Sequence, residues 1–116
     1  MTNDASPASA VGAPVVKTIR ERVPEFEQAF QEALNDEGPD MGAFQAMSVF
    51  AGWLAERIEA SPENSVEQQA FAVIEEVASS ADYPMGRSLV TEFVGALRDN
   101  PRAVALMGPA TVRFAR

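Results

Sequence analysis

The sequence of 116 residues contains no cysteine and no histidine. Without cysteine the chain can form no disulfide, no thiolate nucleophile and no cysteine-ligated metal site. Without histidine it lacks the commonest general base near neutral pH and the commonest metal ligand, and it cannot form a Ser–His–Asp triad. These absences favour a protein that is not an enzyme and that needs neither a cofactor nor a metal.

Other chemical motifs are also missing. The seven glycines are scattered, and none belongs to a phosphate-binding GxGxxG or GxxxxGK loop. The acidic loop at residues 35–40 lacks the alternating ligands and the closing glutamate of a calcium-binding EF-hand, so it indicates the end of one helix and the start of another. Glu56 and Glu59 share a helical face, which leaves a carboxylate-only enzyme as a third, remote alternative.

The chain has no long hydrophobic run and no excess of basic residues. No apolar stretch approaches the roughly 20 residues of a membrane span, and no basic region followed by an apolar run opens the sequence. The net charge of −8 argues against binding to nucleic acid, which depends on neutralising phosphates, and against docking on anionic membranes. We therefore expect a cytoplasmic protein with neither nucleic acid nor a membrane as its partner.

Apolar residues recur every three to four positions through most of the chain, a spacing typical of helices with one buried face. No segment shows the sustained alternation of a strand. Proline, glycine and asparagine mark the boundaries, and the pattern predicts helices over residues 15–22, 24–35, 41–60, 65–81, 85–98 and 102–107, with a last turn at 110–116. Asp40 is the expected N-cap of the third of these helices.

The short loops between the longest segments imply antiparallel neighbours. We therefore predict an all-α fold, an antiparallel bundle of about four main helices plus short terminal helices. Residues 1–13, rich in Ala, Ser, Pro and Gly, are predicted to form a disordered tail. Residues 14–116 then form a single helical domain.

The helical spacing also predicts which side chains are buried. The single tryptophan, Trp53, falls in the most apolar helix and is expected in the core, whereas the single tyrosine, Tyr83, is expected to be partly exposed in a Tyr-Pro turn. The other predicted core residues are Phe50, Leu54, Phe71, Ile74, Phe93 and Leu97.

Charge is distributed unevenly along the chain. Residues 24–76 contain twelve acids and one base, for a net −11, whereas residues 77–116 contain three acids and five bases, for a net +2. An acidic surface of this kind speeds association with a basic partner. The first candidates for a partner-binding face lie around the end of one helix and are Glu56, Glu59 and Glu63. The second candidates lie in the acidic loop and are Asp36, Glu37 and Asp40.

Four segments carry a resemblance to a known group of proteins. They are Pro24-Glu25-Phe26, the segment 71–76 (FAVIEE), the apolar positions of 89–97, and Leu106-Met107-Gly108-Pro109. In these the chain resembles small bacterial helical proteins of unknown function, some of them candidate immunity proteins. The chain departs from that pattern at 82–86 (DYPMG). The resemblance implies the helical fold over about residues 15–114 and brings no site residues.

Two functional hypotheses follow from these observations. The first is a non-enzymatic module that binds a basic protein through an acidic face, of which an immunity protein that neutralises a toxin is one example. The second is a structural or oligomeric adaptor that buries an apolar helix face against copies of itself. Under either hypothesis the acids can also serve only to keep the outer helix faces soluble. The sequence leaves the oligomeric state open.

Overall fold

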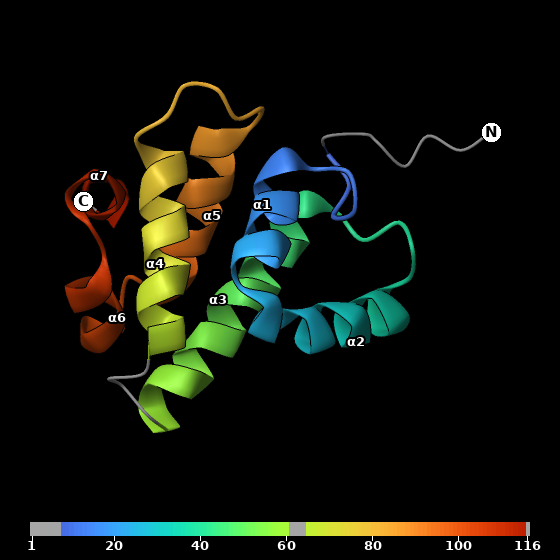
Figure 1. The fold of residues 1–116 in the computed structure, drawn as a ribbon, viewed down its shortest axis with the longest axis horizontal. Coiled ribbons are helices and arrows are strands. Elements are labelled where there is room, and N and C mark those ends of the chain that lie inside the picture. Colours follow the sequence, from blue (N-terminus) through green and yellow to red (C-terminus); the bar gives the residue numbers. More distant parts are fainter. Residues whose placement is uncertain (1–7, 61–64, 116) are drawn as a thin grey trace.

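The computed structural model describes residues 8–60 and 65–115, and its fold is all-α (Figure 1). Within these ranges the only β-type pairing is one isolated bridge between Ser9 and Gly42. The predicted all-α class is confirmed, and the four longest helices are the four predicted main ones. The elements are α1 (Pro14–Arg22), η1 (Pro24–Phe26), α2 (Glu27–Glu37), α3 (Ala43–Ala60), α4 (Ser65–Ala78), α5 (Gly86–Leu97), α6 (Pro101–Leu106), α7 (Pro109–Val112) and η2 (Arg113–Ala115).

Proline and glycine set several of the helix ends. Pro24 opens a short 3₁₀ turn ahead of α2, because proline tolerates a first helical position where its missing N–H is not needed. α2 ends at Gly38, whose φ of 99° lies in a region that glycine adopts without strain. α3 begins at Ala43 rather than at residue 41. Asp40 therefore lies three residues before the helix and is not at the predicted N-cap position.

The helices are arranged around the pair α3 and α5, which make the most extensive contact in the fold. α4 and α5 run antiparallel side by side, and α3 crosses below them (Figure 1). α1 packs on one side of α4, and α7 packs on another. α2 leads away from α1 and lies along α3. The result is the predicted bundle of helical hairpins, with the short C-terminal helices covering one flank of α4.

A chain of aromatic rings crosses the core. Phe26 from η1 meets Phe50 of α3 with ring centroids 4.8 Å apart, Phe50 meets Phe93 of α5 at 5.6 Å, and Phe93 meets Phe71 of α4 at 5.7 Å. Edge-to-face and tilted pairs at these distances add to the burial of the rings. The six residues predicted for the core besides Trp53 are at most 2% exposed.

Residues 8–13 pack against the domain, in contrast to the predicted disordered tail; residues 1–7 of that tail lie outside the described residues. The N–H of Ala10 donates to the Met41 carbonyl at 2.8 Å, and the N–H of Ala43 donates to the Ala8 carbonyl at 2.8 Å. Ala10 and Ala13 are fully buried. The prediction is wrong for residues 8–13 because small side chains let the backbone approach the start of α3 and pair with it.

Glu75 of α4 holds the N-terminus of α7. One carboxylate oxygen accepts the N–H of Ala110 at 2.9 Å, and the other accepts the N–H and the hydroxyl of Thr111 at 2.9 and 2.8 Å. Partial burial of the Glu75 carboxyl raises its pKa, but these hydrogen bonds and the charge of Arg113 outweigh that effect, so the pKa is lowered overall. A carboxylate from another helix thus satisfies the free amides that open α7.

This contact explains Gly108, and it predicts the effect of replacing it. A Cβ at Gly108 would lie 2.5 Å from the Glu75 carboxyl carbon, so the carboxylate would have to move away from the amides that it accepts. We expect Gly108→Ala to lower the free energy of unfolding by about 1–3 kcal/mol, the usual cost of leaving such partners unsatisfied. Urea denaturation measures the change.

A matched control exists on α3. A Cβ at Gly52 would meet nothing within 4 Å, and Gly52 lies inside the helix. Gly52→Ala is therefore expected to stabilise the protein by about 0.5–1 kcal/mol. If both substitutions changed the urea midpoint in the same direction, the contact between Gly108 and Glu75 would not be important for stability.

Candidate functional site

The first candidate acids lie near the C-terminal end of α3. Glu56 and Glu59 are both exposed, and they are three residues apart, so their side chains are neighbours on the helix surface. Neither forms an ion pair within the part of the chain that the structure describes. Glu63 lies outside the described residues. The structure thus presents a pair of uncompensated carboxylates at this end of α3.

The second candidate acids lie at the other end of α3. Asp36 and Glu37 close α2, Asp40 follows in the loop, and all three are exposed. Glu56 lies 13 residues after the first residue of α3, which corresponds to roughly 20 Å along the helix axis at 1.5 Å per residue. The five described candidates therefore do not form one patch but two groups, one near each end of α3.

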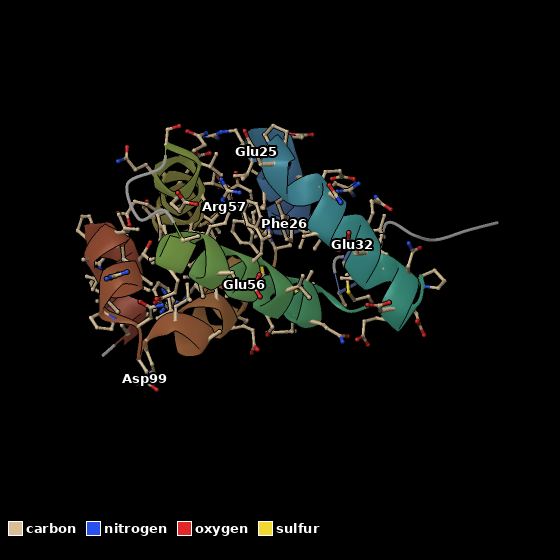
Figure 2. The ribbon with its side chains drawn as sticks, turned by 90° about the horizontal axis from the view of Figure 1, so that it is seen from below. Glu25, Phe26, Glu32, Glu56, Arg57 and Asp99 are labelled. Atoms are coloured by element: carbon tan, nitrogen blue, oxygen red, sulfur yellow. The ribbon has the colours of Figure 1, made fainter. Side chains whose placement is uncertain are left out.

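Two further acids lie on the same side of the molecule as Glu56. Figure 2 views this side and shows Glu25 from η1 and Glu32 from α2 together with Glu56 from α3. Both are exposed, and Glu32 accepts only a 3.3 Å hydrogen bond from Gln28. We call Glu25, Glu32, Glu56 and Glu59 the acidic face. Glu25 and Glu32 could not be recognised from clusters of acids along the sequence, because three separate elements contribute to this face.

Trp53 and Arg57 lie about one turn apart on α3, before and after Glu56 in the sequence, and border the acidic face. The Trp53 ring is partly exposed and packs against Phe26 at 5.3 Å and Phe50 at 6.0 Å between centroids. The Arg57 guanidinium lies 5.0 Å from the centre of the Trp53 ring, within the range of a cation–π interaction. Trp53 is therefore packed on the core as expected, but it also reaches the surface.

Arg57 also forms an ion pair with Glu67 of α4. The Nε of Arg57 donates to Oε2 of Glu67 at 2.7 Å. The Glu67 side chain is fully buried, and its other oxygen, Oε1, has no hydrogen-bond partner among the described residues. Because the carboxylate of Glu67 offsets the charge of Arg57, the one base in residues 24–76 does not neutralise the acidic face.

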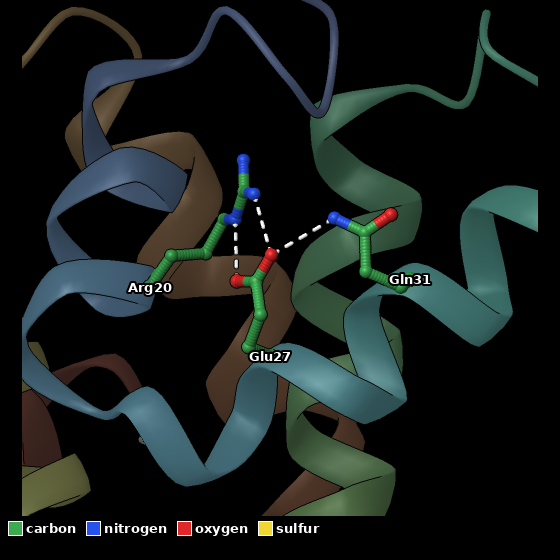
Figure 3. A network of polar contacts seen from close by, with 3 residues as sticks. All are labelled: Arg20, Glu27 and Gln31. Carbon is green, nitrogen blue, oxygen red and sulfur yellow. Dashed lines mark hydrogen bonds and ion pairs between the residues drawn. The ribbon is translucent and has the colours of Figure 1, made fainter.

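Several acids in this region instead hold the fold together. Glu67 and Glu75 are engaged as described, and Glu76 pairs with Arg22 of α1 at 3.0 Å. Figure 3 shows Glu27 between Arg20 and Gln31: the Nε and Nη2 of Arg20 donate to its two oxygens at 2.9 and 2.7 Å, and Gln31 donates at 2.8 Å. The net charge of −11 therefore overstates the number of acids available to a partner.

The Arg20–Glu27 pair predicts a pH dependence of stability. The hydrogen bond from Arg20 lowers the pKa of Glu27 to about 2. A carboxyl whose folded pKa is depressed contributes stability above its unfolded pKa of about 4.3 and loses it as the pH falls toward 2. Because the side chain is 40% exposed, solvent screening limits the contribution to about 1 kcal/mol.

We therefore expect Glu27→Gln to be less stable than the unaltered chain at pH 7 and nearly equal to it near pH 2. Urea denaturation across this range measures the gap. Glu32→Gln serves as the control, because Glu32 forms no ion pair, and its gap should stay small at every pH. A Glu27→Gln gap that did not change with pH would contradict the assigned role of the pair.

Other site chemistry is limited in the residues that the structure covers. Among them no group of three or more acidic side chains is arranged to hold a metal ion. Glu56 and Glu59 line none of the three hollows found in the described surface. None of the described helices combines the length and the hydropathy that crossing a membrane requires.

Comparisons with protein families, with curated proteins and with solved structures find no match to this chain. The resemblance to small bacterial helical proteins therefore stays a prediction from the residues that carry it.

Proposed function

We propose that this protein is a non-enzymatic protein-binding module that takes a basic protein partner on the acidic face. The observation that carries the proposal is the contrast between two sets of acids. Glu27, Glu67, Glu75 and Glu76 are used by the fold, whereas Glu56 and Glu59 are exposed and lack a cationic partner among the described residues. Carboxylates left in this state attract a basic surface and speed its association.

The position of the Trp53–Arg57 pair at the border of the acidic face supports this face as the region that contacts the partner. Tryptophan and arginine are enriched among the residues that dominate binding energy at interfaces. Trp53 is rigidly backed by two phenylalanine rings and stays partly exposed. A partner bound here would gain apolar contact on the indole and electrostatic attraction from Glu56, which lies three residues further along α3.

The alternative of a self-associating adaptor has less support. An apolar interface needs a contiguous exposed patch of several hundred Å². Phe44, 42% exposed, is the one large hydrophobic side chain that stands out as exposed in the described surface. A carboxylate-only enzyme has less support still, because acid–base catalysis needs two carboxylates held in a cleft and no described hollow contains Glu56 or Glu59.

An immunity protein that neutralises a basic toxin in the cytoplasm would be one form of this function. The cysteine-free composition suits a reducing compartment. In this form the partner would be encoded next to this protein, and the acidic face would compete for a basic active-site or substrate-binding surface of the toxin.

Charge reversal tests the proposal. Proteins captured from a lysate of the source organism by the unaltered chain would be compared with those captured by Glu56→Lys/Glu59→Lys, and the protein lost from the second set would be purified. We expect its association rate with the reversed variant to fall by about tenfold or more, as for other electrostatically steered pairs. Surface plasmon resonance measures this rate.

The matched control is Asp36→Lys/Glu37→Lys, which makes the same change in net charge at the opposite end of α3. The association rate of this control should fall much less, and circular dichroism should show both variants folded. Equal rates for the unaltered chain and the Glu56/Glu59 variant would mean that the acids are only a solvated surface. Light scattering would then show whether the chain instead associates with itself.

A further inference from the structure

A basic hollow lies at the end of the molecule away from the acidic face. Between the end of α4 and the start of α5 is a hollow of about 480 Å³, and its lining includes Ser79, Ser80, Tyr83, Arg87 and Ser88. A second hollow of about 330 Å³ is lined by Ala78, Arg87, Arg113 and Phe114. The two share Ala78 and Arg87, so they adjoin. We call the two together the basic hollow. No carboxylate lines either hollow within the described residues.

The two arginines differ from the arginines that the fold uses. Arg20, Arg22 and Arg57 each form an ion pair with a glutamate. Arg87 and Arg113 form none with the described residues, although the chain contains 17 acids and only 9 bases. In so acidic a protein, two arginines that face one hollow without a carboxylate are available to an anion from outside.

The surroundings keep these guanidinium groups available. The Cζ of Arg87 lies 5.4 Å from the centre of the Phe114 ring, which orients the side chain along the hollow without offsetting its charge. Arg113 helps to lower the pKa of Glu75, but both oxygens of that carboxylate already accept hydrogen bonds from Ala110 and Thr111. No carboxylate of the described chain thus bonds to either guanidinium.

Neutral groups complete the lining. Ser88 follows Arg87 in the first turn of α5, where backbone N–H groups have no acceptor within the helix. Met85 and Phe114 add apolar walls. The hydroxyl of Tyr83 donates a hydrogen bond to Oε2 of Glu76 at 3.4 Å, so the ring of Tyr83, and not its hydroxyl, faces the hollow. A ligand bound here would contact the two guanidinium groups with its anionic part and the apolar side chains with its remainder.

From this geometry we infer that the hollow binds the phosphate group of a small phosphate monoester, with Arg87 and Arg113 as the charged donors. Two guanidinium groups from separate elements can each engage a different edge of a tetrahedral dianion, whereas a carboxylate offers only two oxygens in one plane. The apolar walls accommodate the organic part. This site is separate from the acidic face and does not depend on the proposed protein partner.

Titration of the full chain with inorganic phosphate, and then with phenyl phosphate, tests the inference. Both titrations are performed at constant ionic strength and at about pH 8, where each probe is largely a dianion. Backbone amide resonances are followed by NMR. We expect saturable shifts at Arg87, Ser88 and Arg113, and tighter binding of phenyl phosphate because its ring contacts the apolar walls.

Two double variants separate a site from general attraction. Arg87→Gln/Arg113→Gln should weaken phosphate binding by about tenfold or more, because each arginine contributes a charge-assisted hydrogen bond. Arg98→Gln/Arg102→Gln makes the same charge change at exposed arginines outside the hollow and should leave the affinity within about twofold, since screened distant charges act weakly.

Three results would overturn the inference. They are no saturable shift in the unaltered chain, shifts that map elsewhere, and an equal loss of affinity in the two double variants. The map on the unaltered chain remains decisive even if a variant fails to fold.

Discussion

Replacing Arg57 with methionine is expected to lower the free energy of unfolding by about 3–5 kcal/mol. The substitution keeps an unbranched apolar stem over Trp53 but removes the ion-pair partner that Glu67 has among the described residues. The Glu67 carboxylate is fully buried, and one of its oxygens has no hydrogen-bond partner within residues 8–60 and 65–115. A buried charge that loses its partner typically destabilises a protein by this amount. Denaturation in urea at pH 7 measures the effect.

A second variant distinguishes the cost of leaving the Glu67 carboxylate without a partner from the cost of losing the Arg57 side chain itself. In Arg57→Met/Glu67→Leu the buried carboxylate is absent as well, and apolar replacement of a buried ion pair is often neutral or stabilising. This double variant should therefore recover most of the lost stability. Arg98→Met, at an exposed arginine, should change stability by less than about 0.5 kcal/mol. A double variant as unstable as the single one would contradict the role assigned to Glu67.

Phe50→Ala is expected to have an effect of similar size, about 3–5 kcal/mol, since it leaves a cavity in the core. Phe50 is 1% exposed, and its ring contacts those of Phe26, Phe93 and Trp53. Removing it separates η1 from α5 at the centre of the aromatic chain. The shift of the urea midpoint at an unchanged slope measures the loss.

Phe44→Ala is the control on the same helix. Phe44 is 42% exposed and forms no ring contact with the core aromatics, so its removal should cost much less. Equal costs for the two substitutions would show that the assignment of the buried face of α3 is wrong, because the structure places Phe50 in the core and Phe44 at the surface.

The helices could be predicted from the sequence because their apolar spacing is strong. The residues predicted for the core, such as Phe71 and Leu97, are buried, since a period near 3.6 identifies the inner face of a helix without tertiary information. Residues 8–13 could not be predicted in this way. Their position arises from backbone pairing of Ala8 with Ala43 and of Ala10 with Met41 at the start of α3, and small residues give no periodic signal.

The candidate site could be predicted only in part. The charge count identified an acidic segment, and Glu56 and Glu59 are exposed as a binding face requires. The count could not show that Glu67 pairs with a base 10 positions away or that Glu75 caps a helix 35 positions away. Such contacts depend on how the helices pack, so sequence proximity did not indicate which acids remain free.

The basic hollow was missed for a related reason. Arg87 and Arg113 are far apart in the sequence, and they come together because η2 packs against α5. The slight positive balance of residues 77–116 was the only signal. It gave no reason to select these two arginines from the others in the same segment.

The salt dependence of the association rate tests the central claim most directly. Trp53 is the single tryptophan and borders the acidic face, so its fluorescence reports binding there in a stopped-flow experiment with the purified partner. Between about 0.01 M and about 0.15 M salt, the Debye length falls from roughly 30 Å to roughly 8 Å. We predict that the association rate falls steeply over this range while the Trp53 signal changes on binding. A rate that is independent of salt, with no change in Trp53 fluorescence, would contradict the account.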